Sequence, residues 1–268
     1  MRRLLLPILG VYAYLTFVSL LLAFLPAVAL AALVHRRDPT RRVPGRWVCR
    51  LGRVCGAVMP LWRFFVEGPT PPGIESRGYV VVANHESAAD PFLLTRLPWD
   101  MRWVAKDELF RLPLAGWILR AGGLIPIRRG RGGSMRAMLE ACRNTLRDGL
   151  PVMLFPEGTR SPDGELLPFK DGAFELAIEA GVPVVPVALA GTRDCRPKGS
   201  LWFGWATAKA RVLQPFDTAG LTLADAPALR EAVRDRIAAE VADLRRELEA
   251  ANAPRSARPA SKVNPTVL

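Results

Sequence analysis

Apolar and polar positions divide the chain into an N-terminal apolar run and a longer region of short alternating segments. Residues 4–34 hold no charged side chain, and arginines flank the run on both sides. A helix rises about 1.5 Å per residue, so a helix of this length exceeds the roughly 30 Å hydrocarbon core of a bilayer. We therefore expect a membrane-embedded helix, kinked at Pro7, Gly10 and Pro26, that either spans the bilayer at a tilt or returns to the same face.

A cleaved signal peptide is the alternative for this run, because residues 27–31 (Ala-Val-Ala-Leu-Ala) resemble a small-residue cleavage site. The apolar region is longer than the corresponding part of a signal peptide, which favours a retained helix. With arginines at both ends, the positive-inside rule does not choose an orientation.

Residues 45–62 change character, because apolar positions recur there at helical spacing beside a stripe of Arg46, Arg50 and Arg53. This pattern is typical of a helix lying in the membrane interface. The same pattern fits equally well a helix that packs its apolar face on a protein core and exposes its basic face to water. Proximity to the first apolar run favours the membrane, so we assign residues 1–72 to a membrane-associated helical region that ends in a proline-rich linker.

From residue 73 to residue 252, short β-branched runs alternate with helical patterns. Such alternation predicts an α/β domain with a mostly parallel central sheet flanked by helices and with ligands at strand ends. Strands are expected at 79–82, 101–105, 124–127, 151–155 and 184–189, and helices at 90–97, 113–121, 134–148, 172–180 and 223–251. Residues 253–268, rich in Pro, Ser and basic side chains, are expected to form a flexible tail.

The chain is apolar and basic at once, with 50% hydrophobic residues and a net charge of +12. This combination predicts contact with membrane lipids, because anionic headgroups attract Lys and Arg at about 1 kcal/mol per residue. Nucleic acid is the competing partner for a basic chain, but the sequence has no zinc-finger spacing, RNA-recognition motif or helix-turn-helix signature. The four cysteines share no metal-ligand spacing, so we expect no metal site and a reducing compartment.

Residues 84–91 directly follow the first β-branched run and contain one of only two histidines. His85 falls in a turn after the expected strand, and Asp90, followed by Pro91, suits the start of a helix whose free amides it could cap. Across such a turn the Asp90 carboxylate can fold back onto the His85 ring, fix its tautomer and leave the other nitrogen free to take a proton. The alternative is a surface histidine beside a helix-capping aspartate.

Two further turns bring arginines to strand ends, Arg128 after one expected strand and Arg160 in the turn after another. A guanidinium fork matches two phosphate oxygens, and Gly158 frees backbone amides in the second turn. Both turns therefore suit a phosphate group. The alternative for both arginines is ordinary ion pairing with Glu157 or Asp171.

Four motifs occur in order along the chain: His85-x4-Asp90, Gly122 to Arg128, Phe155-Pro156-Glu157-Gly158-Thr159-Arg160, and Val182-Pro183-x-x-Pro186-Val187. Over roughly residues 78–191, this order and spacing resemble those of the glycerolipid acyltransferase family, in particular bacterial 1-acyl-glycerol-3-phosphate acyltransferases. The sequence departs from the family's usual residues at Ala88-Ala89 in the first motif and at Pro126 in the second, which could alter the shape of the acceptor site.

The resemblance implies transfer of a fatty acyl group to the sn-2 hydroxyl of 1-acyl-glycerol-3-phosphate, giving phosphatidic acid. The donor would be an acyl thioester, acyl-CoA or acyl carrier protein, and no further cofactor is implied. His85, oriented by Asp90, would remove the hydroxyl proton as general base. The remaining roles would be phosphate binding by Arg128, Arg160, Gly158 and Lys106, and substrate positioning by Glu157 and Thr159.

Two alternatives stay open. The same chemistry could act on another acceptor, such as glycerol-3-phosphate, a lysophospholipid or a lyso-aminolipid. A protein of a different class would bind membrane lipids with the same fold and without catalysis. Because cytosolic thioesters would supply the acyl group, we expect the inner (cytoplasmic) membrane, with the catalytic domain on its cytoplasmic face.

Overall fold

A seven-stranded sheet forms the centre of the molecule, which we describe from a computed structural model that covers residues 2–128, 132–196, 200 and 202–252. The strands are β1 (Trp62–Glu67), β2 (Val80–Ala83), β3 (Arg102–Lys106), β4 (Ile125–Ile127), β5 (Val152–Leu154), β6 (Val184–Ala190) and β7 (Ala206–Val212). Their order across the sheet is β1-β7-β6-β2-β5-β3-β4, and only the β6–β7 pair is antiparallel. The predicted α/β class with a mostly parallel sheet is confirmed.

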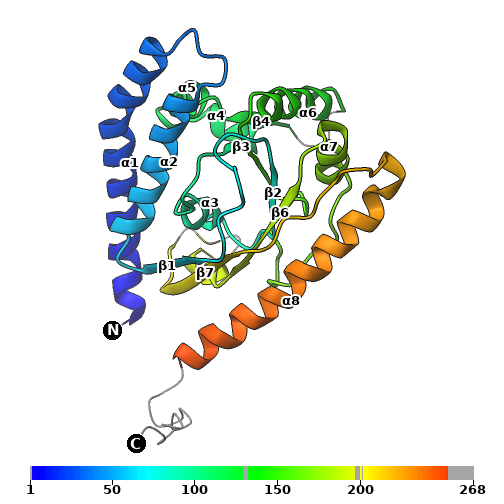
Figure 1. Ribbon diagram of the computed structural model, residues 1–268. Helices are drawn as coiled ribbons and strands as arrows, with labels where there is room; N and C mark the ends of the chain where they lie inside the picture. Colours follow the sequence, from blue (N-terminus) through cyan, green and yellow to red (C-terminus); the bar gives the residue numbers. More distant parts are fainter. Residues whose placement is uncertain (1, 129–131, 197–199, 201, 253–268) are drawn as a thin grey trace, which may run out of the picture.

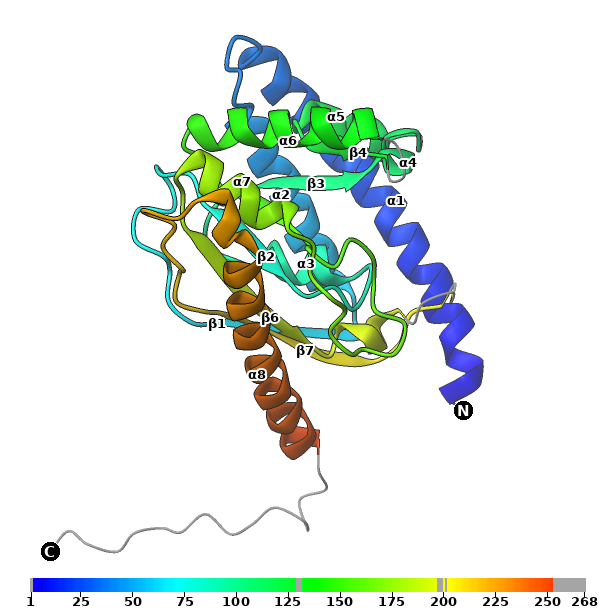
Figure 2. The same ribbon diagram turned by 90° about the vertical axis from the view of Figure 1, so that its right-hand side faces the viewer.

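Helices cover both faces of this sheet (Figure 1). They are α1 (Arg2–Val34), α2 (Arg42–Val58), α3 (Asp90–Leu94), α4 (Asp107–Phe110), α5 (Ala115–Ala121), α6 (Gly132–Arg147), α7 (Gly172–Ala180) and α8 (Ala226–Asn252), with 3-10 turns η1 (Thr192–Cys195) and η2 (Leu223–Asp225). In Figure 2, α6, α7 and α8 lie in front of the sheet, and α2 and α3 lie behind it. The sheet is therefore the middle of three layers.

Strand β2 lies at the centre of these layers and is buried on both faces. Val80 and Val82 belong to the core beneath α6, α7 and α8, whereas Val81 and Ala83 belong to the core on the side of α3. A strand of a parallel sheet that is covered on both faces needs apolar residues at every position, and this explains the unbroken β-branched run. The polar residues that follow β2 are thus delivered to one edge of the sheet by a fixed element.

Helix α8 packs on β6 with one apolar stripe, formed by Leu229, Val233, Ile237, Val241, Leu244 and Leu248. Intervals of three and four residues keep these side chains on one face of a helix. The helix is preceded by a capping box in which Thr222 and Asp225 satisfy each other's backbone amides. The predicted long amphipathic helix on the outside of the domain is confirmed.

Helix α1 runs as one continuous helix through Pro7 and Pro26, without a reversal of direction. It lies beside α2 (Figure 1) and packs on α2 and α5 through a small core that includes Val28, Leu51 and Ile118. Residues 7–34 are long and apolar enough to cross a membrane, a test of length and composition that an N-terminal signal sequence also passes.

The structure differs from expectation at the end of the amphipathic segment. The helix stops at Val58, and residues 62–67, which the sequence placed in the membrane-associated region 1–72, form β1 and pair with β7. Part of the basic stripe faces protein, because Arg53 donates to the carbonyls of Thr95 and Leu97 at 3.0 and 3.1 Å. Arg46 likewise forms an ion pair with Asp100. The expected tail, residues 253–268, lies outside the described residues.

Candidate active site

The residues singled out in the sequence meet at one edge of the sheet, where parallel strands end. His85 follows β2, Glu157 follows β5, Lys106 is the last residue of β3, and Arg128 directly follows β4. These four strands are neighbours in the order β2-β5-β3-β4. Since neighbouring strands lie about 4.8 Å apart, the strand ends that carry His85 and Arg128 are separated by roughly 14 Å along the edge.

The pair His85 and Asp90 has the geometry that the sequence predicted. His85 lies in the turn after β2, and Asp90 is the first residue of α3, with Pro91 in its first turn. His85 Nδ1 lies 2.7 Å from Asp90 Oδ2, and the Asp90 carboxylate is fully buried. This contact assigns Nδ1 to the aspartate and leaves Nε2 as the nitrogen that can accept a proton.

The Asp90 carboxylate points back into the turn instead of capping its own helix. Its Oδ2 accepts the amides of Glu86 and Ser87 at 2.9 and 3.0 Å, and its Oδ1 accepts the hydroxyl of Thr192. The expected capping of α3 by Asp90 is therefore wrong, since α3 has no side-chain cap. A buried carboxylate with donors on both oxygens is held in one orientation.

The His85 ring is also held from its face and from its backbone. It stacks on Phe155 with ring centroids 4.1 Å apart and an interplanar angle of 19°. The His85 amide donates to Glu157 Oε1 at 2.6 Å, and the His85 carbonyl accepts the amide of Ser161 at 2.9 Å. The turn after β5 thus fixes the turn after β2.

The Glu157 carboxylate accepts hydrogen bonds from two backbone amides. Its Oε1 accepts the His85 amide and its Oε2 accepts the Leu167 amide at 3.1 Å. Burial raises the pKa of Glu157 to about 7. Both of its oxygens hold backbone amides and the side chain is buried, and the expected role of Glu157 in positioning the substrate stays a prediction.

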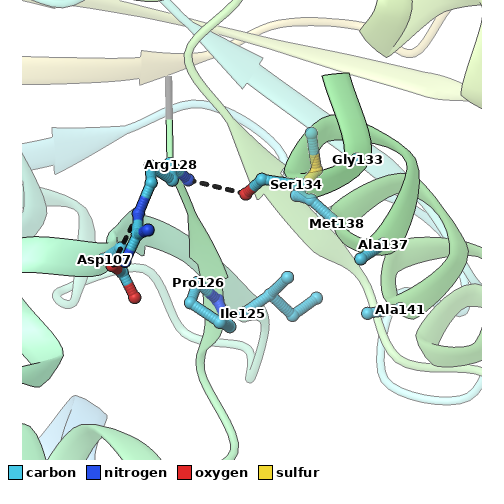
Figure 3. A pocket seen from close by; sticks show the side chains of 9 residues that line it. All are labelled: Asp107, Ile125, Pro126, Arg128, Gly133, Ser134, Ala137, Met138 and Ala141. Carbon is cyan, nitrogen blue, oxygen red and sulfur yellow. Dashed lines mark hydrogen bonds and ion pairs between the residues drawn. The ribbon is translucent and has the colours of Figure 1, made fainter. Parts of the chain in front are cut away.

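Arg128 forms an ion pair, as the alternative interpretation of the sequence allowed, but with a different partner. Its Nε and Nη2 donate to Asp107 Oδ2 at 3.1 and 2.6 Å, and its amide donates to the hydroxyl of Ser134 at 2.8 Å (Figure 3). Asp107 also accepts Arg111 at 2.6 Å. The guanidinium of Arg128 therefore lies beside a carboxylate at the start of α4.

A pocket of about 470 Å³ lies between β4 and α6, next to this ion pair. Figure 3 shows the mainly apolar side chains that line it, together with Asp107, Arg128 and Ser134: Ile125, Pro126, Ala137, Met138 and Ala141. An apolar pocket with a cation at one side suits part of an amphiphile. Pro126, the departure in the second motif, belongs to this lining.

The turn after β5 carries further positive charge. Gly158 adopts a left-handed conformation (φ +69°), and a Cβ there would lie 2.9 Å from Lys170 Nζ. Arg160 is half-buried, Thr159 is exposed, and Lys106 is exposed at the end of β3. Lys170 was not expected, because no spacing in the sequence connects it with the turn.

Three other residues of the site were missed in the sequence: Glu86, Thr192 and Arg245. Glu86 is buried, and burial together with the charge of Asp90 raises its pKa to about 7. Thr192 Oγ1 lies 3.3 Å from Glu86 Oε2, and Arg245 Nη2 lies 3.5 Å from Glu86 Oε1. The position of Thr192 just after β6, which neighbours β2, is the one signal that could have indicated it.

This arrangement can deprotonate an alcohol. An imidazole with one nitrogen on a buried carboxylate and the other free is a general base, and the cations along the same edge suit an anionic group on the molecule that carries the alcohol. In the part of the chain that the structure describes, no group of three His, Cys, Asp or Glu side chains is arranged to hold a metal ion.

Comparison with known proteins connects this geometry to an enzyme family. Residues 63–190 match the family model described as acyltransferase. A 1-acyl-sn-glycerol-3-phosphate acyltransferase of Chlamydomonas reinhardtii is 35% identical over 184 residues, which cover 69% of this chain and 55% of that protein. The human 1-acyl-sn-glycerol-3-phosphate acyltransferase beta is 40% identical over 157 residues, which cover 58% of this chain and 56% of that protein.

The chain therefore spans about half the length of the curated relatives that it matches. The crystal structure of the 1-acyl-sn-glycerophosphate acyltransferase of Thermotoga maritima resembles this chain over more of the chain's length. That structure has a TM-score of 0.76 and 28% identity, and the match covers 91% of this chain and 98% of that one. The likeness extends beyond the residues of the family model.

Proposed function

We propose that this chain, whose residues 63–190 match the acyltransferase family model, moves a fatty acyl group from an acyl thioester to the sn-2 hydroxyl of 1-acyl-sn-glycerol-3-phosphate. The product is phosphatidic acid. The observation that carries the proposal is the 2.7 Å contact between His85 Nδ1 and the buried Asp90 carboxylate at the end of a central strand. The names of the similar proteins support the choice of acceptor.

In the proposed reaction His85 Nε2 takes the proton of the acceptor hydroxyl while the hydroxyl oxygen attacks the thioester carbonyl. A carbon–oxygen ester bond forms, the carbon–sulfur bond breaks, and the imidazolium returns the proton to the departing thiolate. Asp90 stabilises the imidazolium, as the aspartate of a serine-protease triad does. General-base help of this kind contributes about 10²- to 10⁴-fold to the rate.

The acceptor phosphate is proposed to bind among the cations at the same edge, as the sequence predicted for Lys106, Gly158, Arg128 and Arg160. Arg128 must then share its guanidinium between Asp107 and the phosphate, or exchange one for the other. Lys170, above Gly158, is added to this set. Thr159, exposed in the same turn, is kept as a residue that positions the substrate, whereas Glu157 is assigned to holding His85.

The acyl donor is proposed to be acyl-CoA or acyl carrier protein. The protein is proposed to contact membrane lipids and to act at the inner membrane. Exposed apolar side chains along α1 support attachment to a bilayer. Because thioesters of both kinds are cytosolic, the catalytic domain is proposed to face the cytoplasm. The arginine and lysine residues beside the site fit the anionic surface of such a membrane.

An acceptor panel tests this function. The purified full-length protein is incubated in lipid vesicles with labelled acyl-CoA and, separately, with 1-acyl-glycerol-3-phosphate, glycerol-3-phosphate and a lysophosphatidylcholine. We expect a labelled diacyl product from the first acceptor at the highest kcat/KM. A higher kcat/KM on another acceptor would contradict the proposed substrate, and lipid binding without turnover of any acceptor would identify the non-catalytic alternative.

A further inference from the structure

The two oxygens of Asp90 are held by different parts of the chain. Oδ2 faces His85 and the amides of its own turn, all within five residues in sequence. Oδ1 accepts the hydroxyl of Thr192, which stands in η1 just after β6 and 102 residues away. Thr192 is fully buried. It also lies outside residues 63–190, the stretch that the family model matches.

The Thr192 hydroxyl lies between two carboxyl groups. It contacts Asp90 Oδ1 and lies 3.3 Å from Glu86 Oε2. A hydroxyl carries one proton, so it can donate to only one of the two. When it donates to Asp90, a hydrogen bond with Glu86 requires that Glu86 be the donor and carry a proton. Burial next to the charge of Asp90 favours this protonated form of Glu86.

Helix α8 closes the cluster from outside through Arg245. The guanidinium lies 3.5 Å from Glu86 Oε1, donates to Glu165 Oε1 at 3.0 Å and also donates to the carbonyl of Gly164. Arg245 therefore connects α8 with Glu86 and with the loop at residues 164–165, which follows the turn after β5. Arg245, like Thr192, lies beyond the residues that the family model matches.

We propose that Thr192 is a positioning residue of the acyl-transfer site, whose hydroxyl fixes Asp90 and thereby His85, and that Glu86, held by Arg245 of α8, directs this hydroxyl toward Asp90. The inference rests on the proposed function for its kinetic consequence, but its geometry is independent of the substrate. Without the hydroxyl, Oδ1 becomes a buried acceptor with its donor removed, and the carboxylate is free to turn away from Nδ1.

The threonine is tested with Thr192→Val, which keeps the shape and removes the hydroxyl, and with Thr192→Ser, which keeps the hydroxyl. The matched control is Thr218→Val, because Thr218 is also buried and donates to the Val182 carbonyl at 3.0 Å, away from the site. We expect kcat to fall about 10- to 100-fold in Thr192→Val with little change in KM, since a hydrogen bond to a charged group is lost. Thr192→Ser should retain most of kcat, and Thr218→Val should stay within about twofold of the wild type.

The arginine is tested with Arg245→Met against Arg246→Met. Arg246 is the next residue on α8 and pairs only with Asp243 among the described residues. We expect Arg245→Met to lower kcat about 3- to 10-fold, because Glu86 then loses the contact at Oε1 that holds its side chain beside Thr192. This arm also decides the proposal if Thr192→Val does not fold by circular dichroism, and equal kcat in the two methionine variants would then overturn it.

A spectroscopic readout separates this inference from the proposed function. The chain has two histidines, so ¹⁵N-histidine labelling with His35→Gln assigns the ring signals of His85. We expect the Nδ1 proton that bridges to Asp90 to be visible in the wild type and in Thr192→Ser, and to be lost or displaced in Thr192→Val. A wild type that transfers no acyl group defeats the proposed function alone. An unchanged Nδ1 proton with wild-type kcat in Thr192→Val defeats the positioning role.

Discussion

At the scale of single residues, the site depends on a buried aspartate with a donor on each oxygen. An amide in place of the Asp90 carboxylate has one acceptor oxygen, so Asp90→Asn must leave at least one donor facing an NH₂ group. We expect kcat to fall by about 10²- to 10⁴-fold, because the His85 tautomer is no longer fixed. Steady-state kinetics with 1-acyl-glycerol-3-phosphate and acyl-CoA measure this change.

The control for this substitution is Asp217→Asn. Asp217 also accepts a backbone amide two residues on, at 3.1 Å, but it is exposed and follows Phe216, which pairs with Val184 at the start of β6, the end opposite to the site. It should keep wild-type kcat. An Asp90→Asn variant that turns over within about threefold of this control would remove the aspartate from the mechanism.

Arg128 provides a second test at this scale, because a neighbouring arginine shares its partner. Arg128 and Arg111 both donate to Asp107 Oδ2, but the side chain of Arg128 is 36% exposed beside the pocket and that of Arg111 is 60% exposed. We expect Arg128→Ala to raise the KM for the acceptor about 10- to 100-fold, since a charge-assisted contact with the phosphate is lost. Arg111→Ala should change this KM less than threefold, and equal effects of the two substitutions would contradict phosphate binding by Arg128.

The residues missed in the sequence were missed for a reason that belongs to this scale. His85 and Asp90 lie five residues apart, so a turn and a helix start were enough to predict their contact. Thr192 and Arg245 reach Glu86 across 106 and 159 residues. Such contacts depend on the order of strands in the sheet and on where α8 packs, and neither feature has a local pattern.

At the scale of elements, Glu86 in the turn between β2 and α3 makes the stability of the fold depend on pH. Its pKa is about 7 in the folded protein and 4.5 at its usual value, because burial and then the charge of Asp90 disfavour the ionised form. Between these pH values the folded state holds the proton and the unfolded state has lost it. The contribution of Glu86 to the free energy of unfolding therefore falls as the pH rises from about 4.5 to 7 and is constant above that.

Glu86→Gln removes this titration. A difference of 2.5 pKa units corresponds to about 3 kcal/mol, so the wild type should lose up to about that much unfolding free energy between pH 5 and pH 7.5 from this group. Denaturant titrations in detergent at the two pH values measure the loss. We expect a smaller loss in Glu86→Gln, and an equal loss in both proteins would show that Glu86 does not titrate in this range.

The elements that could be predicted are those with strong local patterns. The five strands β2 to β6 are apolar runs between turn residues, and α7 begins and ends at the expected residues 172 and 180. Strand β1 was missed because Trp62 continues the helical spacing of the segment before it. Strand β7 alternates small buried residues, Ala208 and Ala210, with basic residues that pair with Glu67 and Glu247, so its apolar signal is weak.

At the scale of the whole molecule, α1 packs on α2 and α5 and leaves an apolar surface along its other side. Side chains along α1 remain exposed, among them Leu22 at 53% and Leu30 at 62%. A chain with this surface is stable in water only at a cost, whereas a bilayer removes it from water. This surface supports the predicted membrane attachment, and the inner membrane remains a proposal.

Introducing acidic side chains on the exposed face of α1 tests whether this helix attaches the protein to a membrane. We expect the double substitution Leu22→Glu and Leu30→Glu to lower binding to vesicles about 100-fold or more, because an acidic side chain costs about 2.5–3.5 kcal/mol at the centre of a bilayer. Flotation with vesicles that contain anionic lipid measures the bound fraction. The control is Leu223→Glu, since Leu223 is 52% exposed in η2, before α8 on the other side of the sheet (Figure 1). Unchanged flotation of the double variant would contradict a membrane role for α1.

The central claim is that His85 is the base of an acyl transfer, and the chain supplies its own control in His35. The measurement is the rate of labelled phosphatidic acid formation from 1-acyl-glycerol-3-phosphate and acyl-CoA by His85→Ala and His35→Ala in vesicles. We predict a fall of about 10²- to 10⁴-fold in kcat for His85→Ala, with unchanged folding and vesicle binding, and wild-type turnover for His35→Ala. Retention of turnover by a folded His85→Ala variant would contradict the mechanism.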